Sequence, residues 1–179
     1  MLIQEYNPNW AINFEKIKAI LNASISNYIL DIQHVGSTSV PNLAAKPIID
    51  IDIIYGGDDD FDTIKTALEK LGYYHNGNQG IEEREVFKRN GKIVDEILDK
   101  ITHHLYVCKT GCWELQRHLL FRDYLRKDEL TRKFYEKLKY EIAEETQNNK
   151  SKYAVLKQLK ADPFIDYVIE LEKRTLKNK

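Results

Sequence analysis

The sequence predicts an α/β (α+β) protein in which a mixed β-sheet is flanked by helices and followed by a helical C-terminal third. Two observations carry this prediction. Short segments rich in β-branched and apolar residues recur before residue 112, separated by Gly and Asn turns. From Trp113 onward, the apolar residues recur at helical spacing. We expect one domain over 1–179, with a sheet-containing core over 1–112 and a helical part over 113–179.

Composition describes an ordinary globular protein. The chain has 179 residues, of which 42% are hydrophobic and 31% charged, and its net charge is −1. This balance disfavours a nucleic-acid partner. The first ten residues are too polar for a signal peptide, and no apolar run is long enough for a membrane span, so we expect no membrane partner and a cytoplasmic location. Cys108 and Cys112 do not form a disulfide framework.

The elements before residue 112 follow from local patterns. Residues 10–21 place Trp10, Phe14, Ile17 and Leu21 at helical spacing, which predicts a first helix. Residues 61–71 predict a second helix that ends at Gly72, and 73–81 predict a loop. The expected strands cover 28–35, 48–55, 85–89, 93–98 and 104–108, with a hairpin turn at Asn90–Gly91 and an acidic loop at 58–60.

The C-terminal third is predicted as a series of helices. Asp128 is the expected cap between a helix that begins near Trp113 and one that ends near residue 145. Two final helices are expected over 151–159 and 163–176, the second with Asp162 as its cap and Pro163 at its first position. Tyr135, Lys139 and Tyr153 fall in this part of the chain, and aromatic residues at helical spacing most often belong to a core.

Two aspartates on one predicted strand are the first candidate functional residues. Side chains alternate along a strand, so Asp50 and Asp52 share a face, about 7 Å apart, while Ile49, Ile51 and Ile53 point to the other. Mg²⁺ favours one or two carboxylates together with substrate phosphates. The pair therefore suggests a site for Mg²⁺ or Mn²⁺; the plainer alternative is an edge strand with two exposed acids.

A turn shortly before the aspartates is the second candidate. Gly36 lets the backbone approach a ligand closely, Ser37 and Thr38 provide backbone amides and hydroxyls, and Lys46 adds a positive charge. Together with paired carboxylates, these groups suit phosphoryl or nucleotidyl transfer. The alternative is a tight turn beside a buried strand.

The stretch "HVGSTSVPNLAAKPIIDI" closely resembles the GrpB family (UPF0157 type), as do "NPNWAINFEKI", "THHLYV", "FRDYLR" and "FYEKLK". This resemblance implies the nucleotidyltransferase superfamily of the DNA polymerase β type. It implies transfer of a nucleoside monophosphate from an NTP to an unknown acceptor, with Mg²⁺ or Mn²⁺. The alternative is a non-catalytic nucleotide- or coenzyme-binding accessory module. Gln33, Asn42 and Tyr106 depart from the family pattern, which usually has Glu, Gly and His there.

Each of the remaining candidate residues has more than one possible role. A third metal ligand is sought among Glu85, Asp95, Asp99 and His104, of which the family match favours His104 as a catalytic group. His34 either contacts the ligand or fixes the turn by a hydrogen bond. Arg122 is expected to meet nucleotide phosphates, or else to form surface ion pairs. A zinc site built from His103, His104, Cys108 and Cys112 is disfavoured by strand geometry.

Overall fold

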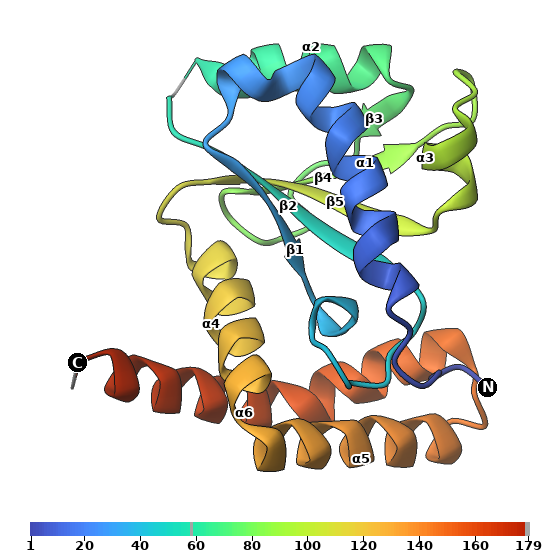
Figure 1. The fold of residues 1–179 in the computed structure, drawn as a ribbon, viewed down its shortest axis with the longest axis vertical. Coiled ribbons are helices and arrows are strands. Elements are labelled where there is room, and N and C mark those ends of the chain that lie inside the picture. The colour runs from blue at the N-terminus through green and yellow to red at the C-terminus, as the bar shows by residue number, and fades with distance from the viewer. Residues whose placement is uncertain (58, 178–179) are drawn as a thin grey trace.

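A five-stranded mixed sheet lies at the centre of the computed structural model, which describes residues 1–57 and 59–177 (Figure 1). Only β2 and β5 run parallel; the other neighbours are antiparallel. The strand order is β1-β2-β5-β4-β3. The strands are β1 (Asp31–Val35), β2 (Ile49–Tyr55), β3 (Tyr73–His75), β4 (Arg84–Arg89) and β5 (His103–Lys109).

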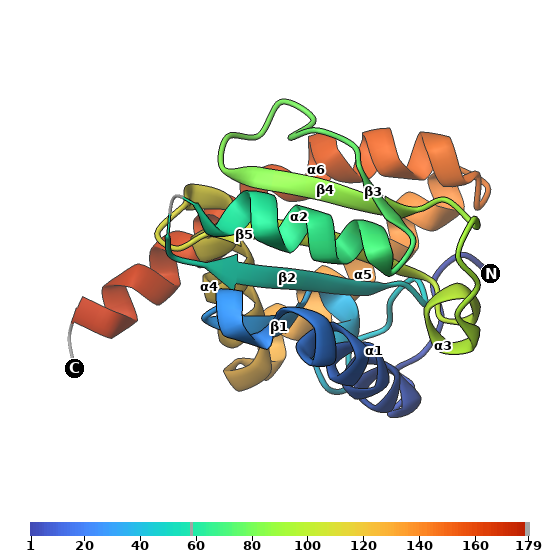
Figure 2. The same cartoon turned by 90° about the horizontal axis from the view of Figure 1, so that it is seen from above.

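Helices cover the two faces of the sheet unequally (Figures 1 and 2). One face is covered by α1 (Asn9–Ile25) and α2 (Asp60–Lys70), with the short α3 (Glu96–Lys100) beside them. The other side is occupied by α4 (Trp113–Lys127), α5 (Glu129–Glu145) and α6 (Lys150–Lys177). Two 3₁₀ turns, η1 (Ser26–Tyr28) and η2 (Ser37–Ser39), flank β1. The predicted fold class, a mixed sheet with a helical C-terminal part, is confirmed.

Alternation along β2 separates the core from the site, as predicted. Ile49, Ile51 and Ile53 are buried in the cluster that α1 and α2 complete. Asp50 and Asp52 therefore point to the opposite face, toward α4. The core contacts of the isoleucines fix the register of β2, because a slip by one residue would bury the carboxylates against α1.

Two predictions in the sheet region are wrong. Residues 73–75, expected to be a loop, form β3, because Tyr73 is 1% exposed and belongs to the core. Residues 93–98 do not form a strand: Asp95 accepts hydrogen bonds from the amides of Ile97 and Leu98 and so begins α3. The expected hairpin across residues 90–91 is therefore absent from the described chain, and β4 pairs with β3 and β5 instead.

The prediction of two helices divided at residue 162 is also wrong. α6 runs without interruption from Lys150 to Lys177 and contains Pro163. Proline removes one helical hydrogen bond, but Ala161, Ile165 and Ile169 are buried against α4 and α5, and this packing holds one continuous helix. The side chain of Asp128 accepts a hydrogen bond from the amide of Thr131, so the predicted cap of α5 is confirmed.

None of the helices described within residues 1–57 and 59–177 is long and apolar enough to cross a membrane. The acidic loop expected over 58–60 lies partly outside the described residues, because residue 58 is not among them; α2 begins at Asp60.

Candidate functional site

A cavity of about 420 Å³ lies between the polar face of the sheet and the helices α4, α5 and α6. Its walls combine the turn after β1, the start of β2, and side chains from all three C-terminal helices. Seven of the predicted site residues line it: Gly36, Ser37, Thr38, Lys46, Asp50, His104 and Arg122. The fold thus gathers around one space residues that lie up to 86 positions apart in the sequence, counting from Gly36 to Arg122.

Gly36 lies directly against Asp50. Val35 and Asp50 are paired across β1 and β2, and the chain turns at Gly36 with a φ of +68°. A Cβ atom added to Gly36 would lie 2.2 Å from Oδ2 of Asp50, which is far inside van der Waals contact. Both the left-handed φ and the close approach therefore require glycine here.

Hydrogen bonds beneath the turn hold η2 in place. Nε2 of His34 lies 3.0 Å from Oγ1 of Thr38, whose hydroxyl donates to the carbonyl of Ile48 at 3.1 Å. The His34 ring also stacks on Phe14 of α1, with centroids 4.7 Å apart. Burial lowers the pKa of His34 to about 4, although the charge of Asp50 opposes this shift. His34 therefore makes the hydrogen bond to Thr38 that was one of its two expected roles, fixing the turn.

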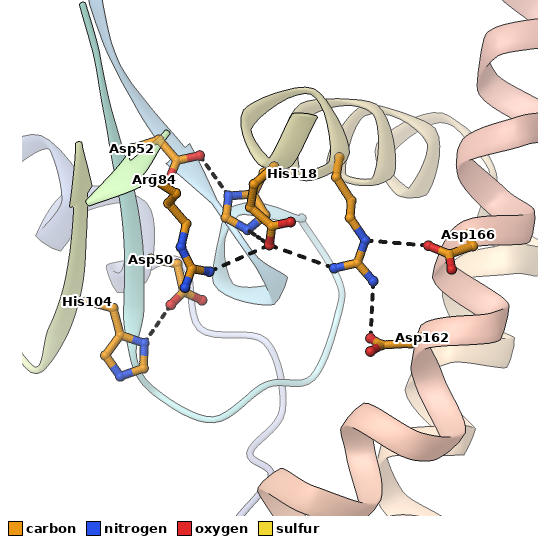
Figure 3. A network of polar contacts seen from close by, with 9 residues as sticks. Asp50, Asp52, Arg84, His104, His118, Asp162 and Asp166 are labelled. Atoms are coloured by element: carbon orange, nitrogen blue, oxygen red, sulfur yellow. Dashed lines mark hydrogen bonds and ion pairs between the residues drawn. The ribbon is translucent and has the colours of Figure 1, made fainter. Parts of the chain in front are cut away.

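Asp52 lies below the cavity surface, in a network of charges (Figure 3). Its side chain is fully buried, and Oδ2 accepts a hydrogen bond from Nδ1 of His118 on α4 at 2.8 Å. The other nitrogen of His118 lies 3.3 Å from Glu114, which also pairs with Arg84 of β4. His118 thus separates Asp52 from the cavity, whereas Asp50 is partly exposed to it.

His118 carries a positive charge at neutral pH. Burial lowers the pKa of His118, but the hydrogen bonds and charges of Asp52 and Glu114 outweigh burial and raise it to about 10. His118 is not among the predicted site residues, because a histidine inside a helix without a metal-ligand motif carries no signal of its own. Only the packing of α4 against the sheet places it beside Asp52.

His104 is the predicted catalytic residue nearest Asp50. The two residues are paired across the parallel strands β2 and β5, and Nδ1 of His104 lies 2.9 Å from Oδ1 of Asp50. The other third-ligand candidates lie elsewhere. Glu85 bonds His75 on the opposite face, Asp95 caps α3, and Asp99 pairs with Arg89. No group of three or more His, Cys, Asp or Glu placed to hold a metal ion occurs among the described residues.

Asp50 and Asp52 nevertheless offer carboxylate oxygens to a divalent cation, which would have to share Asp52 with the charged His118. Oδ1 of Asp52 is buried without a hydrogen-bond partner, which is costly for a carboxylate. Asp50, two residues away on the same face, is partly exposed to the cavity. Two carboxylates and no protein cage are the donor set that Mg²⁺ uses when substrate phosphates complete its coordination. Cys108 and Cys112 are buried free thiols that pack on Leu115. Among the described residues they do not form a zinc site with His103 and His104.

Arg122 ties α4 to the strand before the turn. Its guanidinium donates to the side chain of Gln33 at 2.6 Å and to the carbonyl of His34 at 3.0 Å, and it also pairs with Asp123. Arg126 donates to the carbonyl of Ser39 in the same turn. Both arginines thus hold the turn against α4, and Arg122 lines the cavity while doing so.

The described chain combines a mixed sheet, a glycine turn after β1 and alternate aspartates on β2 in one fold. Solved structures of the poly(U) polymerase Cid1 share it: one bound to MgATP has a TM-score of 0.58 at 13% identity, covering 83% of this chain and 46% of that one. At this identity the likeness concerns the fold alone.

The chain belongs to the GrpB family, whose model matches residues 1–170. The glutamate-rich protein GrpB of Alkalihalophilus pseudofirmus is 36% identical over 174 residues, which cover 94% of each chain. The crystal structure of GrpB from Enterococcus faecalis is 31% identical, with a TM-score of 0.79 over 97% of this chain and 98% of that one. The UPF0157 protein YqkA of Bacillus subtilis is 36% identical over 148 residues, 83% of this chain but only 41% of that longer protein.

Replacing Gly36 with alanine tests the contact with Asp50. We expect Gly36→Ala to lower the free energy of unfolding by clearly more than the roughly 1–3 kcal/mol that a sparsely populated backbone region costs a non-glycine residue, since the new methyl group would overlap Asp50. Chemical denaturation measures the difference. Gly80→Ala is the matched control, because Gly80 has a φ of +84° and open space around its Cα. Equal losses in the two variants would contradict the proposed contact.

His34 gives the protein a specific pH dependence. The folded protein keeps His34 neutral down to about pH 4, whereas the unfolded chain binds a proton near pH 6.5. Stability should therefore fall as the pH drops from 6.5 to 4, by up to roughly 3 kcal/mol, and should not depend on His34 above that window. Urea unfolding between pH 7 and 4.5 measures this. The loss of stability at low pH should be smaller in His34→Gln than in the wild type. Identical dependence of the free energy of unfolding on pH in the two proteins would refute the role of His34.

Proposed function

We propose that this protein is a metal-dependent nucleotidyltransferase that moves a nucleoside monophosphate from an NTP to an unknown acceptor. The observation that carries the proposal is the contact of the Gly36 turn with Asp50 at the wall of a cavity large enough for a nucleotide. Backbone groups of the turn and a carboxylate that favours cations thereby face the same space. The likeness of the fold to a polymerase solved with MgATP supports the same class of chemistry.

Residues of this chain would divide the reaction among them. Asp50 and Asp52 would hold Mg²⁺ or Mn²⁺, which supplies charge neutralisation and orientation of the phosphates. The turn at Gly36, Ser37 and Thr38 would hold the phosphates, with Lys46 as an additional positive charge. Catalysis in this reaction class is mostly positioning and electrostatic stabilisation, and the preformed turn meets that need.

His104 is suited to accept the proton of the acceptor. Its Nδ1 bonds to Asp50, which favours the tautomer with hydrogen on Nδ1 and leaves Nε2 as a proton acceptor. The acceptor oxygen would form a bond to the α-phosphorus of the NTP as the bond to the bridging oxygen breaks. Pyrophosphate would leave with that electron pair, and the proton of the acceptor would pass to Nε2 of His104.

Two observations favour the second candidate function, a nucleotide- or coenzyme-binding module without turnover. Asp52 is already neutralised by the imidazolium of His118, and a third carboxylate is missing from the positions of β5 that face Asp50 and Asp52, namely His104 and Tyr106. A protein of this kind would bind the nucleotide through the turn and the cavity alone. Both candidates share the ligand and differ in whether both aspartates are needed for chemistry.

Pyrophosphate release from a panel of NTPs, with Mg²⁺ or Mn²⁺ and candidate acceptors, tests the enzyme. We expect Asp50→Asn and Asp52→Asn each to lower turnover by roughly a hundredfold or more, since each removes charge that the metal needs. Asp62→Asn, an exposed acid of α2 on the far side of the sheet, is the control for a generic loss of charge and should retain full activity.

Two outcomes would count against this proposal. Metal-independent nucleotide binding without pyrophosphate release would favour the binding module. Failure of every NTP to bind would overturn both candidate functions.

A further inference from the structure

Three lysines from distant segments converge at the helical end of the cavity. Lys46 precedes β2, Lys139 belongs to α5 and Lys157 to α6, and all three line the cavity. Nζ of Lys46 lies 4.0 Å from the ring centre of Tyr153, and Nζ of Lys139 lies 4.8 Å from that of Tyr135. We refer to Lys46, Lys139 and Lys157 as the lysine cluster.

The lysine cluster forms no direct ion pair with a carboxylate among the described residues. Within residues 1–57 and 59–177, none of the three forms a salt bridge: Lys139 donates to the carbonyl of Ala44, and Lys157 interacts with the hydroxyl of Tyr135. The cavity arginines differ, because Arg117 pairs with Glu114, Asp162 and Asp166, and Arg122 pairs with Asp123. The charges of the arginines are thus largely balanced by direct ion pairs. The lysine cluster has no such pair, although the charge of Glu136 acts on Lys139 and that of Asp50 acts on Lys157.

The lysines also repel one another. Burial lowers the pKa of Lys139 well below its ordinary value, and the charge of Lys157 lowers it further. Burial and the charges of Lys157 and Lys150 likewise lower the pKa of Lys46. Clustered like charges in a partly enclosed space are unfavourable. An anion with several negative oxygens would relieve this repulsion, and lysine is a regular phosphate ligand.

We propose that the lysine cluster is a polyphosphate-binding subsite that takes the terminal phosphates of the donor nucleotide, an inference that rests on the proposed function. The lysine cluster and Asp50 line the same cavity, so a phosphate chain held by the lysines would approach the Gly36 turn and the aspartates. The pKa of Lys157 is raised chiefly by Tyr135, against the effect of burial, and the charge of Asp50 adds to this shift, which agrees with this proximity. The subsite would make the protein select triphosphates over monophosphates and would stabilise the departing pyrophosphate.

Calorimetric titration with inorganic tripolyphosphate, in the presence of a chelator, tests the subsite without a metal or a base. We expect binding to the wild type and at least tenfold weaker binding to Lys46→Gln and to Lys157→Gln. Lys152→Gln is the matched control, because Lys152 is an exposed lysine of α6 outside this cavity, and its affinity should not change. Unaltered melting temperatures would show that the variants fold; both replaced lysines are only half-buried.

Comparison of NTP with the corresponding monophosphate identifies the source of the phosphate. Loss of affinity for NTP but not for the monophosphate in the two variants supports the terminal phosphates of the donor. Loss for tripolyphosphate alone would reassign the lysine cluster to a phosphorylated acceptor and overturn the assignment to the donor. Absence of tripolyphosphate binding, or equal binding by wild type and both variants, would overturn the subsite itself.

The Asp50→Asn/Asp52→Asn variant separates this proposal from the proposed function. We expect it to bind metal-free tripolyphosphate at least as tightly as the wild type, because the lysines remain and negative charge is removed. If the wild type shows no turnover yet binds tripolyphosphate through the lysine cluster, the proposed enzyme fails and the subsite stands.

Discussion

The close approach of Gly36 to Asp50 is the contact on which the rest of the site depends. It exists because β1 and β2 are antiparallel neighbours with Val35 paired to Asp50, so the chain leaves β1 directly above the carboxylate. The register in turn depends on the isoleucines of β2, which are buried against α1. A single alternating strand thus fixes both the hydrophobic core and the distance between the turn and the carboxylates.

The charges around this contact are distributed in two regions. Near the sheet, the buried negative charge of Asp52 is matched by His118, and Glu114 connects this pair to Arg84 and Arg117. Toward α5 and α6, positive charge exceeds negative charge in the cavity wall. An elongated anion with a bound cation would match both regions, since its phosphates would meet the lysines and its cation the aspartates. This complementarity is the physical reason for preferring a nucleotide triphosphate as the ligand.

Much of this arrangement could be predicted from local sequence patterns. Alternation over 48–55 predicted which face carries the aspartates, and helical spacing from Trp10 to Leu21 predicted α1. The backbone of Asn42 has a φ of +61°, a conformation that asparagine tolerates better than most residues. These features are encoded within a few neighbouring residues.

The failures arose where tertiary contacts outweighed local patterns. Packing keeps α6 continuous through Pro163, and the Asp95 cap turns an expected strand into the start of a helix. The aromatic residues Tyr135 and Tyr153 are expected to be core residues; they are buried, and together with the buried Lys139 they also line the cavity. No spacing rule could place Lys157 or His118, because each reaches the site only through the way three separate helices pack against the sheet.

A crystal structure with Mn²⁺ and a non-hydrolysable NTP analogue would show whether Asp50 and Asp52 hold the metal of a bound nucleotide. We expect an anomalous peak from Mn²⁺ beside the carboxylates of Asp50 and Asp52, with the triphosphate running from the Gly36 turn toward α5 and α6. A nucleotide bound outside this cavity, or Mn²⁺ located away from both aspartates, would contradict it.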